Sequence, residues 1–334
     1  MSSKEIIKTE KEYILSICIP TYNRDKYLSR LLNSIVKQIN HDKLPVEVCI
    51  TDNASEDLTE NICRQYEQDY DFIKYNRQNV NTGADKNIAE AYKMGTGDFV
   101  WIIGDDDDIV DNCMHHLVSL LLKERNNTAL IYLSSVFIPS HSKKWHQIKK
   151  NNNFLLHTML CIDPISIIKR AGIEITFISG IIINKYRYPI NIDEISNLYE
   201  TNLVQLSWVF NALKKGEKFI HVKNPIIIAE PNNSGGYNIF RVFSSNFIKI
   251  TESYFHNNDK IINIFRTESL YFVMPFLFNK KIGKNFDTDN AKLITDLHYS
   301  TLFVYKKIFR KLLNSPVILK NIYHVMVRVR KLLY

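Results

Sequence analysis

The first hundred residues alternate short apolar runs with longer segments in which apolar residues recur every three or four positions. The run at 13–20 (YILSICIP) is apolar, rich in β-branched residues and ends at a proline, which is typical of a buried strand. Apolar residues between positions 25 and 39 fall on one face of a helix. The same reasoning predicts strands over 46–51, 72–76 and 99–103, and helices over 55–70 and 81–94. This alternation is typical of a parallel, doubly wound α/β sheet with right-handed crossovers.

The regularity weakens after this first third. Further elements are predicted as strands over 129–138, 178–184 and 225–229, and as a helix over 202–215. The polar segments 141–153 and 231–237 predict loops. Helical periodicity dominates from Phe240 onward. This change predicts an α/β domain over 1–239, followed by a helical and basic C-terminal region over 240–334.

Composition narrows the class of protein. The 334 residues are 45% hydrophobic and 23% charged, which is typical of a globular chain with one large domain or two modest ones. The five cysteines form no CxxC pair, which argues against a disulfide scaffold and a structural zinc site. No apolar run reaches the ~18 residues of a membrane span, and the charged segment 1–12 does not resemble a signal peptide. We therefore expect a cytoplasmic protein.

The net charge of +8 is concentrated at one end of the chain. Residues 297–334 contain eight basic residues and no acidic one, so the remaining 296 residues are close to neutral. A neutral body with a basic tail predicts a surface contact at one end of the molecule. No known nucleic-acid motif accompanies the tail, so nucleic acid is not the expected partner.

Four successive carboxylates, Asp105 to Asp108, follow Gly104 directly after the strand at 99–103. The carboxyl end of a strand in an open α/β sheet is where ligands bind. A divalent cation would relieve the repulsion between these side chains, and hard oxygen ligands suit Mg²⁺ or Mn²⁺. The alternative is a solvated acidic turn that caps the next helix. The position directly after an apolar strand favours the metal site.

Three other loops are expected at the same edge of the sheet, at 20–24 (PTYNR), 52–55 (DNAS) and 79–83 (NVNTG). Asp52 could accept a hydrogen bond from a base or ribose, and Tyr22 could stack on a ring. Each loop by itself is ordinary turn chemistry, so the argument depends on their convergence. Neither GxGxxG nor GxxxxGK[ST] is present, so neither a dinucleotide cofactor nor a P-loop is predicted.

The segments SICIPTYNR, VEVCITDNASED, NVNTGADKN and GDFVWIIGDDDDI, in this order and spacing, resemble the family 2 glycosyltransferases of the GT-A fold. The resemblance covers residues 16–114. It implies a GT-A (Rossmann-like) α/β fold with a mostly parallel sheet flanked by helices, a nucleotide-diphosphate sugar donor, Mn²⁺ or Mg²⁺, and transfer to an acceptor hydroxyl. Residues 13–115 would form the nucleotide-sugar half of the domain, and residues 116–239 the acceptor half.

The resemblance also implies roles for particular residues. The nucleotide-sugar site would comprise Pro20, Thr21, Tyr22, Asn23, Asp52, Asn81, Lys86, Asp105 and Asp106, with Asn87 beside Lys86. Asp106 and Asp107 match the last two carboxylates of the family's DxD-type motif and would hold the metal. Gly104 stands where the family usually has an Asp, and either Asp105 or Asp108 could compensate.

Segments 101–104, 178–187 and 225–233 together most resemble bacterial enzymes that add a dideoxyhexose branch to O-antigen, the abequosyltransferase-like group. Many inverting members have a catalytic Asp or Glu before a helix, because the acceptor hydroxyl must lose its proton. Glu200 matches that position, with Asp193 and Glu194 as alternatives. Glu200 could equally be an ordinary residue at the start of a helix. The QxxRW element of processive synthases is absent, which predicts transfer of a single sugar.

The resemblance implies a role in assembling a surface polysaccharide on a lipid-linked saccharide acceptor. The basic tail mixes Lys and Arg with apolar residues at helical spacing, so we expect it to contact the anionic inner face of the plasma membrane. A tail packed on the body is the alternative. Two other functions stay open: a nucleotidyltransferase, and a degenerate module that binds a nucleotide sugar without transferring it.

Overall fold

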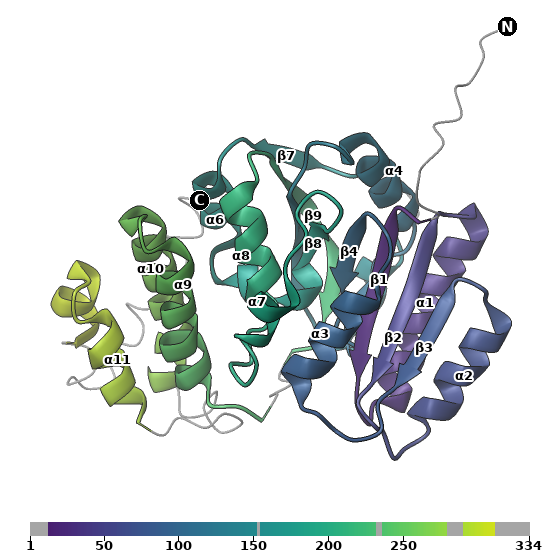
Figure 1. The fold of residues 1–334 in the computed structure, drawn as a ribbon, viewed down its shortest axis with the longest axis horizontal. Helices are drawn as coiled ribbons and strands as arrows, with labels where there is room; N and C mark the ends of the chain where they lie inside the picture. Colours follow the sequence, from purple (N-terminus) through teal and green to yellow (C-terminus); the bar gives the residue numbers. More distant parts are fainter. Residues whose placement is uncertain (1–12, 152–153, 232–235, 279–289, 311–334) are drawn as a thin grey trace, which may run out of the picture.

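The structure is a computed structural model, and it describes residues 13–151, 154–231, 236–278 and 290–310. Within these residues, one mixed sheet of nine strands forms the centre of the molecule, with helices on both faces (Figure 1). Its strand order is β3-β2-β1-β4-β8-β6-β9-β5, and β7 also pairs with β9. The expected α/β fold class is therefore confirmed.

The N-terminal half of the sheet is parallel, as the sequence predicts. Its strands are β1 (Leu15–Thr21), β2 (Val46–Asp52), β3 (Ile73–Arg77) and β4 (Phe99–Ile102). They alternate with α1 (Asp25–Asp42), α2 (Thr59–Asp69) and α3 (Ala84–Met94). The last two helices begin three to four residues later than predicted. Because of these later starts, the polar residues of both loops lie at the carboxyl edge of the sheet.

The remaining strands introduce antiparallel pairs. β8 (Ile181–Asn184) lies antiparallel between β4 and β6 (Leu130–Phe137), while β6 and β9 (Phe219–Ala229) are parallel. The short strands β5 (Asp108–Ile109) and β7 (Thr158–Cys161) pair antiparallel with β9. The prediction of a strand over 225–229 found only the second half of β9.

The predicted loop over 141–153 is wrong in part, because α5 (Lys143–Lys149) lies within it. Ser142 caps this helix by accepting from the backbone N–H of Trp145, whose side chain is buried. The helices without a predicted range are α4 (Met114–Glu124), α6 (Pro164–Ala171) and α7 (Ile192–Ser196). The predicted helix over 202–215 is α8 (Leu206–Lys215), which begins four residues later.

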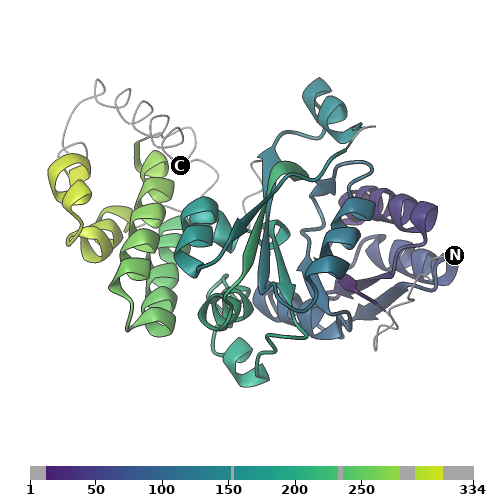
Figure 2. The same ribbon diagram turned by 90° about the horizontal axis from the view of Figure 1, so that it is seen from above.

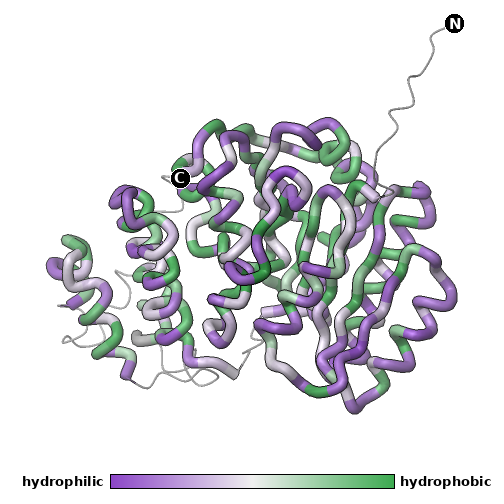
Figure 3. Tube along the Cα trace, in the orientation of Figure 1, coloured by the Kyte–Doolittle hydropathy of each residue, from purple (hydrophilic) through white to green (hydrophobic). Residues whose placement is uncertain are grey.

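The core lies on both faces of the sheet, and the hydrophobic positions follow the strands (Figure 3). Side chains alternate between the faces along each strand. On β1, for example, Ile17 and Ile19 belong to the cluster under α1 and α4, whereas Cys18 belongs to the cluster under α3 and α8. All three are fully buried, which fixes the register of β1 and hence the position of the loop that follows it.

The C-terminal helices lie at one end of the sheet, beyond α6 and α8 (Figures 1 and 2). They are α9 (Phe247–Phe255), α10 (Asp259–Phe278) and α11 (Ala291–Tyr299), with π-helical turns at Arg241–Asn246 and Tyr305–Phe309. Phe210 of α8 packs against Phe255 of α9 and Phe265 of α10, with ring centroids 5.0 and 5.5 Å apart. The helical region therefore shares a core with the α/β domain. Among the described helices, none has both the length and the hydrophobicity that crossing a bilayer requires.

Candidate active site

The loops after β1, β2 and β4 meet at one edge of the sheet. Thr21 at the end of β1 donates a hydrogen bond from Oγ1 to Oδ2 of Asp105, 2.7 Å away. Asn53 after β2 donates from Nδ2 to Oδ1 of Asn81 at 2.8 Å. Asn53 Oδ1 also accepts from the backbone N–H of Thr82 at 2.8 Å. The structure thus brings together the loops that the sequence places at this edge.

The acidic loop carries more negative charge than its surroundings neutralise. Burial and the charge of Asp106 raise the pKa of Asp105 to about 7 and that of Asp107 to about 8, although hydrogen bonds from Thr21 and Ser179 lower them. Arg24 lies nearby, with Nη1 3.9 Å from Oδ2 of Asp106. An additional cation would favour the ionised form of these carboxyl groups.

Ser179 connects the acidic loop to the turn before β8. Its Oγ donates to Oδ2 of Asp107 at 2.5 Å and accepts from the backbone N–H of Gly104 at 2.9 Å. A Cβ at Gly104 would lie 3.2 Å from Asp106 Oδ1 and 3.3 Å from Asp107 Oδ2, closer than ordinary van der Waals contact. An Asp at this position would also add a charge to an already crowded loop, so the glycine fits this arrangement.

Asp108 is separate from the other three carboxylates. It is fully buried, with Lys149 Nζ of α5 2.5 Å from Oδ1 and Arg30 Nε 3.7 Å from Oδ2. Its ion pairs join β5 to α5 and α1. Asp108 is thus engaged in these ion pairs, and Asp105 stays the predicted substitute for the missing first carboxylate of the DxD-type motif.

The donor chemistry of this loop fits Mg²⁺ or Mn²⁺, because carboxylate oxygens suit both ions. The described residues contain no group of three or more His, Cys, Asp or Glu side chains that already converges on a metal position. Mg²⁺ is typically bound by one or two carboxylates together with substrate phosphates. Two carboxylates at an open edge are consistent with a cation whose remaining ligands come from a diphosphate.

A cleft of about 600 Å³ opens beside the acidic loop. Asp106 and Asp107 line it together with three further carboxylates, Asp85, Glu174 and Glu230. The rest of the cleft wall is largely apolar and aromatic, and includes side chains from the C-terminal helices. These wall residues are Phe137, Ile173, Phe177, Ile178, Tyr237, Phe243, Phe272 and Phe276.

The loop before α8 is held by Asp85 of α3. Its buried carboxylate accepts from the backbone N–H groups of Asn202 at 2.8 Å and Val204 at 3.3 Å. Glu200 in this loop has a left-handed backbone, with φ of 65°, and an exposed side chain that is not among the cleft-lining residues. Its role as catalytic base stays a prediction from the sequence.

The other predicted site residues fall into a buried group and an exposed group. Asp52 is fully buried, and its carboxylate accepts from Ser55 Oγ at 2.5 Å and from the Tyr75 hydroxyl at 2.8 Å. Thr21 is also buried, and Pro20 is half-buried. The exposed residues are Tyr22, Asn23, Asn81 and Lys86. Lys86 lines a separate cleft of about 430 Å³ beside residues 76–82, whereas Asn87 is buried and donates to the carbonyl groups of Thr21 and Thr51.

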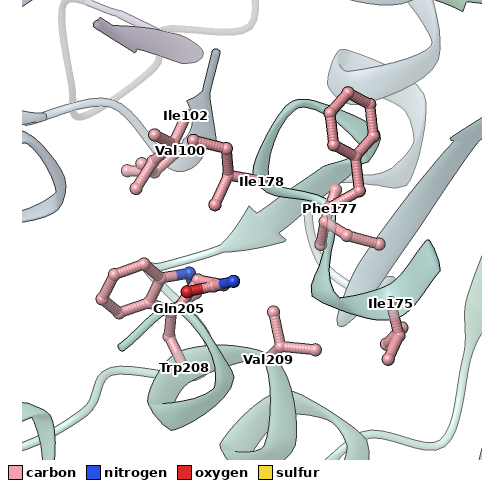
Figure 4. A pocket seen from close by; sticks show the side chains of 9 residues that line it. Val100, Ile102, Ile175, Phe177, Ile178, Gln205, Trp208 and Val209 are labelled. Carbon is pink, nitrogen blue, oxygen red and sulfur yellow. The ribbon is translucent and has the colours of Figure 1, made fainter. Parts of the chain in front are cut away.

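Figure 4 shows the residues around a small internal cavity of about 10 Å³, which shares part of its lining with the cleft. Phe177, Ile178 and Gln205 line both spaces. Gln205 donates from Nε2 to the carbonyl of Thr176 at 2.6 Å, and its Oε1 is buried without a hydrogen-bond partner. The cavity is about the size of one water molecule, and Gln205 lies in the wall between it and the cleft.

Ser179, Glu174 and Glu230 were not predicted from the sequence. Glu174 and Ser179 lie on short 3₁₀ turns before β8, and Glu230 directly follows β9; no local motif marks them. The apolar strand signals over 178–184 and 225–229 were the only indication that nearby residues reach the edge of the sheet.

Comparison with known proteins decides the family. The model of glycosyl transferase family 2 matches residues 16–176. Abequosyltransferase RfbV from Salmonella typhimurium is 32% identical over 236 residues, which cover 66% of this chain and 67% of that relative. The chain belongs to the family 2 glycosyltransferases. The resemblance inferred from the strand-end motifs is thereby confirmed.

Two further relatives and one solved structure agree. TarS from Staphylococcus aureus, a poly(ribitol-phosphate) β-N-acetylglucosaminyltransferase, is 30% identical over 124 residues, which cover 36% of this chain and 21% of TarS. A Campylobacter jejuni GalNAc(5)-diNAcBac-PP-undecaprenol β-1,3-glucosyltransferase is 30% identical over 105 residues, which cover 31% of this chain and 33% of that enzyme. The crystal structure of TarS 1–349 with UDP-GlcNAc has a TM-score of 0.54 at 18% identity, covering 86% of this chain and 87% of the other, which supports the fold.

Proposed function

We propose that this glycosyltransferase moves a single sugar from a nucleotide-diphosphate donor to a hydroxyl of a saccharide acceptor during bacterial surface polysaccharide assembly. The observation that most supports this is one cleft whose lining includes both Asp106 and Asp107 and an aromatic wall. The similarity to an abequosyltransferase favours a deoxyhexosyl donor over a hexosyl one.

The donor would bind along the edge formed by the first three strand-end loops. Tyr22 is 41% exposed, so its ring is accessible for stacking on a nucleotide. Asn23 and Asn81 offer exposed amides beside it. The buried Asp52 would reach the base or ribose only by exchanging one of its present donors, Ser55 or Tyr75. Arg24 adds positive charge near the expected diphosphate, whereas Lys86 lies in the separate cleft beside residues 76–82.

Asp106 and Asp107 would hold Mn²⁺ or Mg²⁺ at the acidic loop. When bound, the cation neutralises charge that develops on the leaving diphosphate. Thr21 keeps Asp105 against the end of β1, and Ser179 keeps Asp107 against the turn before β8. Arg30 donates to the carbonyl of Asp106 at 2.6 Å, which fixes the loop from the α1 side. The chain's own contribution is thus to hold the two carboxylates in place before the substrate arrives.

The acceptor would lie along the aromatic wall, because apolar ring faces suit the faces of sugars. Phe272 and Phe276 of α10 and Phe243 of the preceding π-helix belong to this wall. A lipid-linked acceptor agrees with the undecaprenol-linked substrate in the name of one relative. Such an acceptor requires the enzyme to work at a membrane surface, and we propose peripheral attachment at the cytoplasmic face through the basic C-terminus.

A donor screen tests this function. The full chain would be incubated with UDP-, GDP-, CDP- and dTDP-sugars, with octyl glycosides as acceptors, in Mn²⁺ and in EDTA. We expect one donor class to yield a glycosylated product that is lost in EDTA. Nucleotide binding without any product would favour the degenerate binding module, and release of pyrophosphate from a sugar phosphate and a nucleoside triphosphate would favour a nucleotidyltransferase.

A further inference from the structure

The cleft contains carboxylates beyond those of the acidic loop, and their hydrogen bonds differ. Asp85 accepts from the backbone N–H groups of Asn202 and Val204, so it holds a loop in place. Glu230 lies next to the acidic loop. Its backbone N–H forms a hydrogen bond with Asp107, and this bond lowers the pKa of Asp107. The Glu230 carboxylate accepts from the backbone N–H of Ser140 at 3.0 Å. Glu174 lies instead among the residues of the apolar wall.

Glu174 is held by a single side chain. The hydroxyl of Tyr132 on β6 donates to its Oε2 at 2.7 Å. Tyr132 is 5% exposed, and burial together with the charge of Glu174 raises its pKa, so the hydroxyl stays protonated and remains a donor. The Tyr132 ring stacks on His221 at a centroid distance of 4.8 Å. Burial lowers the pKa of His221 to about 4, so that ring is neutral at physiological pH.

This arrangement is that of a carboxylate oriented by a second group beside a substrate cleft. A general base must lie within hydrogen-bond distance of the reacting hydroxyl, and its carboxylate must be held in a fixed orientation. A neighbouring hydrogen-bond donor often supplies that orientation. Glu174 has both features, since it lines the same cleft as Asp106 and Asp107, and Tyr132 fixes one of its oxygens. Glu200 has neither, because it is exposed and does not line the cleft.

We propose that Glu174 is the general base of the transfer and that Tyr132 is its positioning residue. This inference rests on the proposed function. The acceptor hydroxyl gives its proton to the Glu174 carboxylate while its oxygen forms a bond to C1 of the donor sugar. The bond from C1 to the diphosphate oxygen breaks, and its electron pair leaves with the nucleoside diphosphate. The protonated Glu174 then releases its proton to water.

The test compares three carboxylates in one assay. Glu174→Gln keeps an oxygen that can accept from Tyr132, so the local fold is preserved while the base is removed. We expect Glu174→Gln to lower kcat for transfer to an octyl glycoside by about 10²-fold or more. Its KM for the donor and its Kd for the nucleoside diphosphate with Mn²⁺ should stay within about twofold. Glu230→Gln and Glu200→Gln, at the two competing carboxylates, should each lower kcat far less than Glu174→Gln does.

Two further variants separate a catalytic role from a structural one. Glu174→Asp keeps a carboxylate and should recover part of the lost kcat, whereas a purely structural role predicts no such recovery. Tyr132→Phe should lower kcat by about tenfold with the same nucleotide Kd, because Glu174 loses its orienting donor. Glu174→Gln activity within threefold of wild type would overturn the assignment, as would a larger loss in Glu230→Gln or Glu200→Gln. If the wild type transfers no sugar from any donor, the proposed function itself fails, and this inference with it.

Discussion

At the scale of single residues, neighbouring carboxylates in the acidic loop do different things. Asp106 and Asp107 line the cleft, whereas Asp108 is buried in ion pairs with Lys149 and Arg30. Sequence position alone does not separate them, because all four carboxylates are consecutive. The turn at Gly104 and the hydrogen bond from Ser179 decide which ones face the cleft.

Asp106→Asn and Asp107→Asn should each lower the transfer rate by roughly 10²-fold or more, because each removes a charged oxygen from the cation and the diphosphate. The melting temperature should stay near that of wild type, since Asp106 and Asp107 contribute nothing to the hydrophobic core. The measurement is the initial rate with the donor found in the screen, alongside thermal unfolding. Asp71→Asn, at an exposed position outside the cleft, is the matched control. Rates within a few-fold of wild type in both variants would make the acidic loop an ordinary turn.

Ser179→Ala should weaken the cation site without removing a ligand. It deletes the donor to Asp107 and the acceptor for the Gly104 N–H, and loss of such outer contacts typically reduces metal affinity by about 10–100-fold. We expect the Mn²⁺ concentration for half-maximal rate to rise by about tenfold, with recovery at high Mn²⁺. Ser207→Ala, a buried serine that bonds only within its own turn, is the control. An unchanged Mn²⁺ dependence would contradict this role.

The residues that could be predicted share one property. Thr21, Asp52 and Asp106 lie one or a few residues from the end of a strong apolar strand, so local pattern and sheet topology suffice to place them. Ser179 and Glu174 lie on 3₁₀ turns whose position depends on the antiparallel β8. No local pattern encodes how such a turn packs against a loop 70 residues away.

At the scale of elements, a buried carboxylate on β2 ties together three strands. Glu47 accepts from Ser16 of β1 at 2.6 Å, from Thr96 before β4 at 2.7 Å and from Lys74 of β3 at 2.7 Å. Burial raises its pKa, but these hydrogen bonds outweigh burial and lower the pKa from 4.5 to about 2. A carboxyl group with a depressed pKa stabilises the fold above its unfolded-state pKa.

This contribution should disappear in acid. The drop in the Glu47 pKa to about 2 corresponds to about 3 kcal/mol of unfolding free energy. It is fully present above about pH 5 and is lost as the pH falls towards 2. Urea unfolding of wild type and Glu47→Gln between pH 2 and 7 measures it. The difference in free energy of unfolding between the two proteins should be largest at neutral pH and shrink below pH 4.5. A difference that does not change with pH would show that Glu47 stabilises the fold through packing and not through its charge.

Some helices and strands could be predicted from the sequence and others could not. The parallel strands and helices of the first hundred residues could be predicted, because β1, β2 and β4 are short apolar runs buried on both faces and the helices bury one face. The antiparallel β8 was found as a strand, but its direction is set by its neighbours β4 and β6. Helix α5 was missed because its seven residues are mostly polar, and only Trp145 is buried.

At the scale of the whole molecule, charge and exposed apolar residues meet at the C-terminal end. Leu293 and Leu297 of α11 are 70% and 71% exposed, and Phe303 is 74% exposed. Lys306, Lys307 and Arg310 lie just beyond them and are exposed as well. The remaining basic residues of the predicted membrane contact fall in 311–334, outside the described residues. An anionic lipid surface would match both the apolar and the basic side chains of this end.

Removing residues 311–334 should therefore release the protein from anionic vesicles. The cut leaves Tyr305 and Phe309 in place, because both are fully buried in the helical core. The deleted segment contains five basic residues, worth about 5 kcal/mol at such a surface. Co-sedimentation with phosphatidylglycerol vesicles should fall in the truncated protein and in the full chain at high salt, since salt screens the attraction. Leu293→Glu should weaken binding at constant length, and phosphatidylcholine vesicles are the neutral control. Full-length protein that ignores anionic vesicles at low salt would show that the basic tail does not serve as a membrane contact.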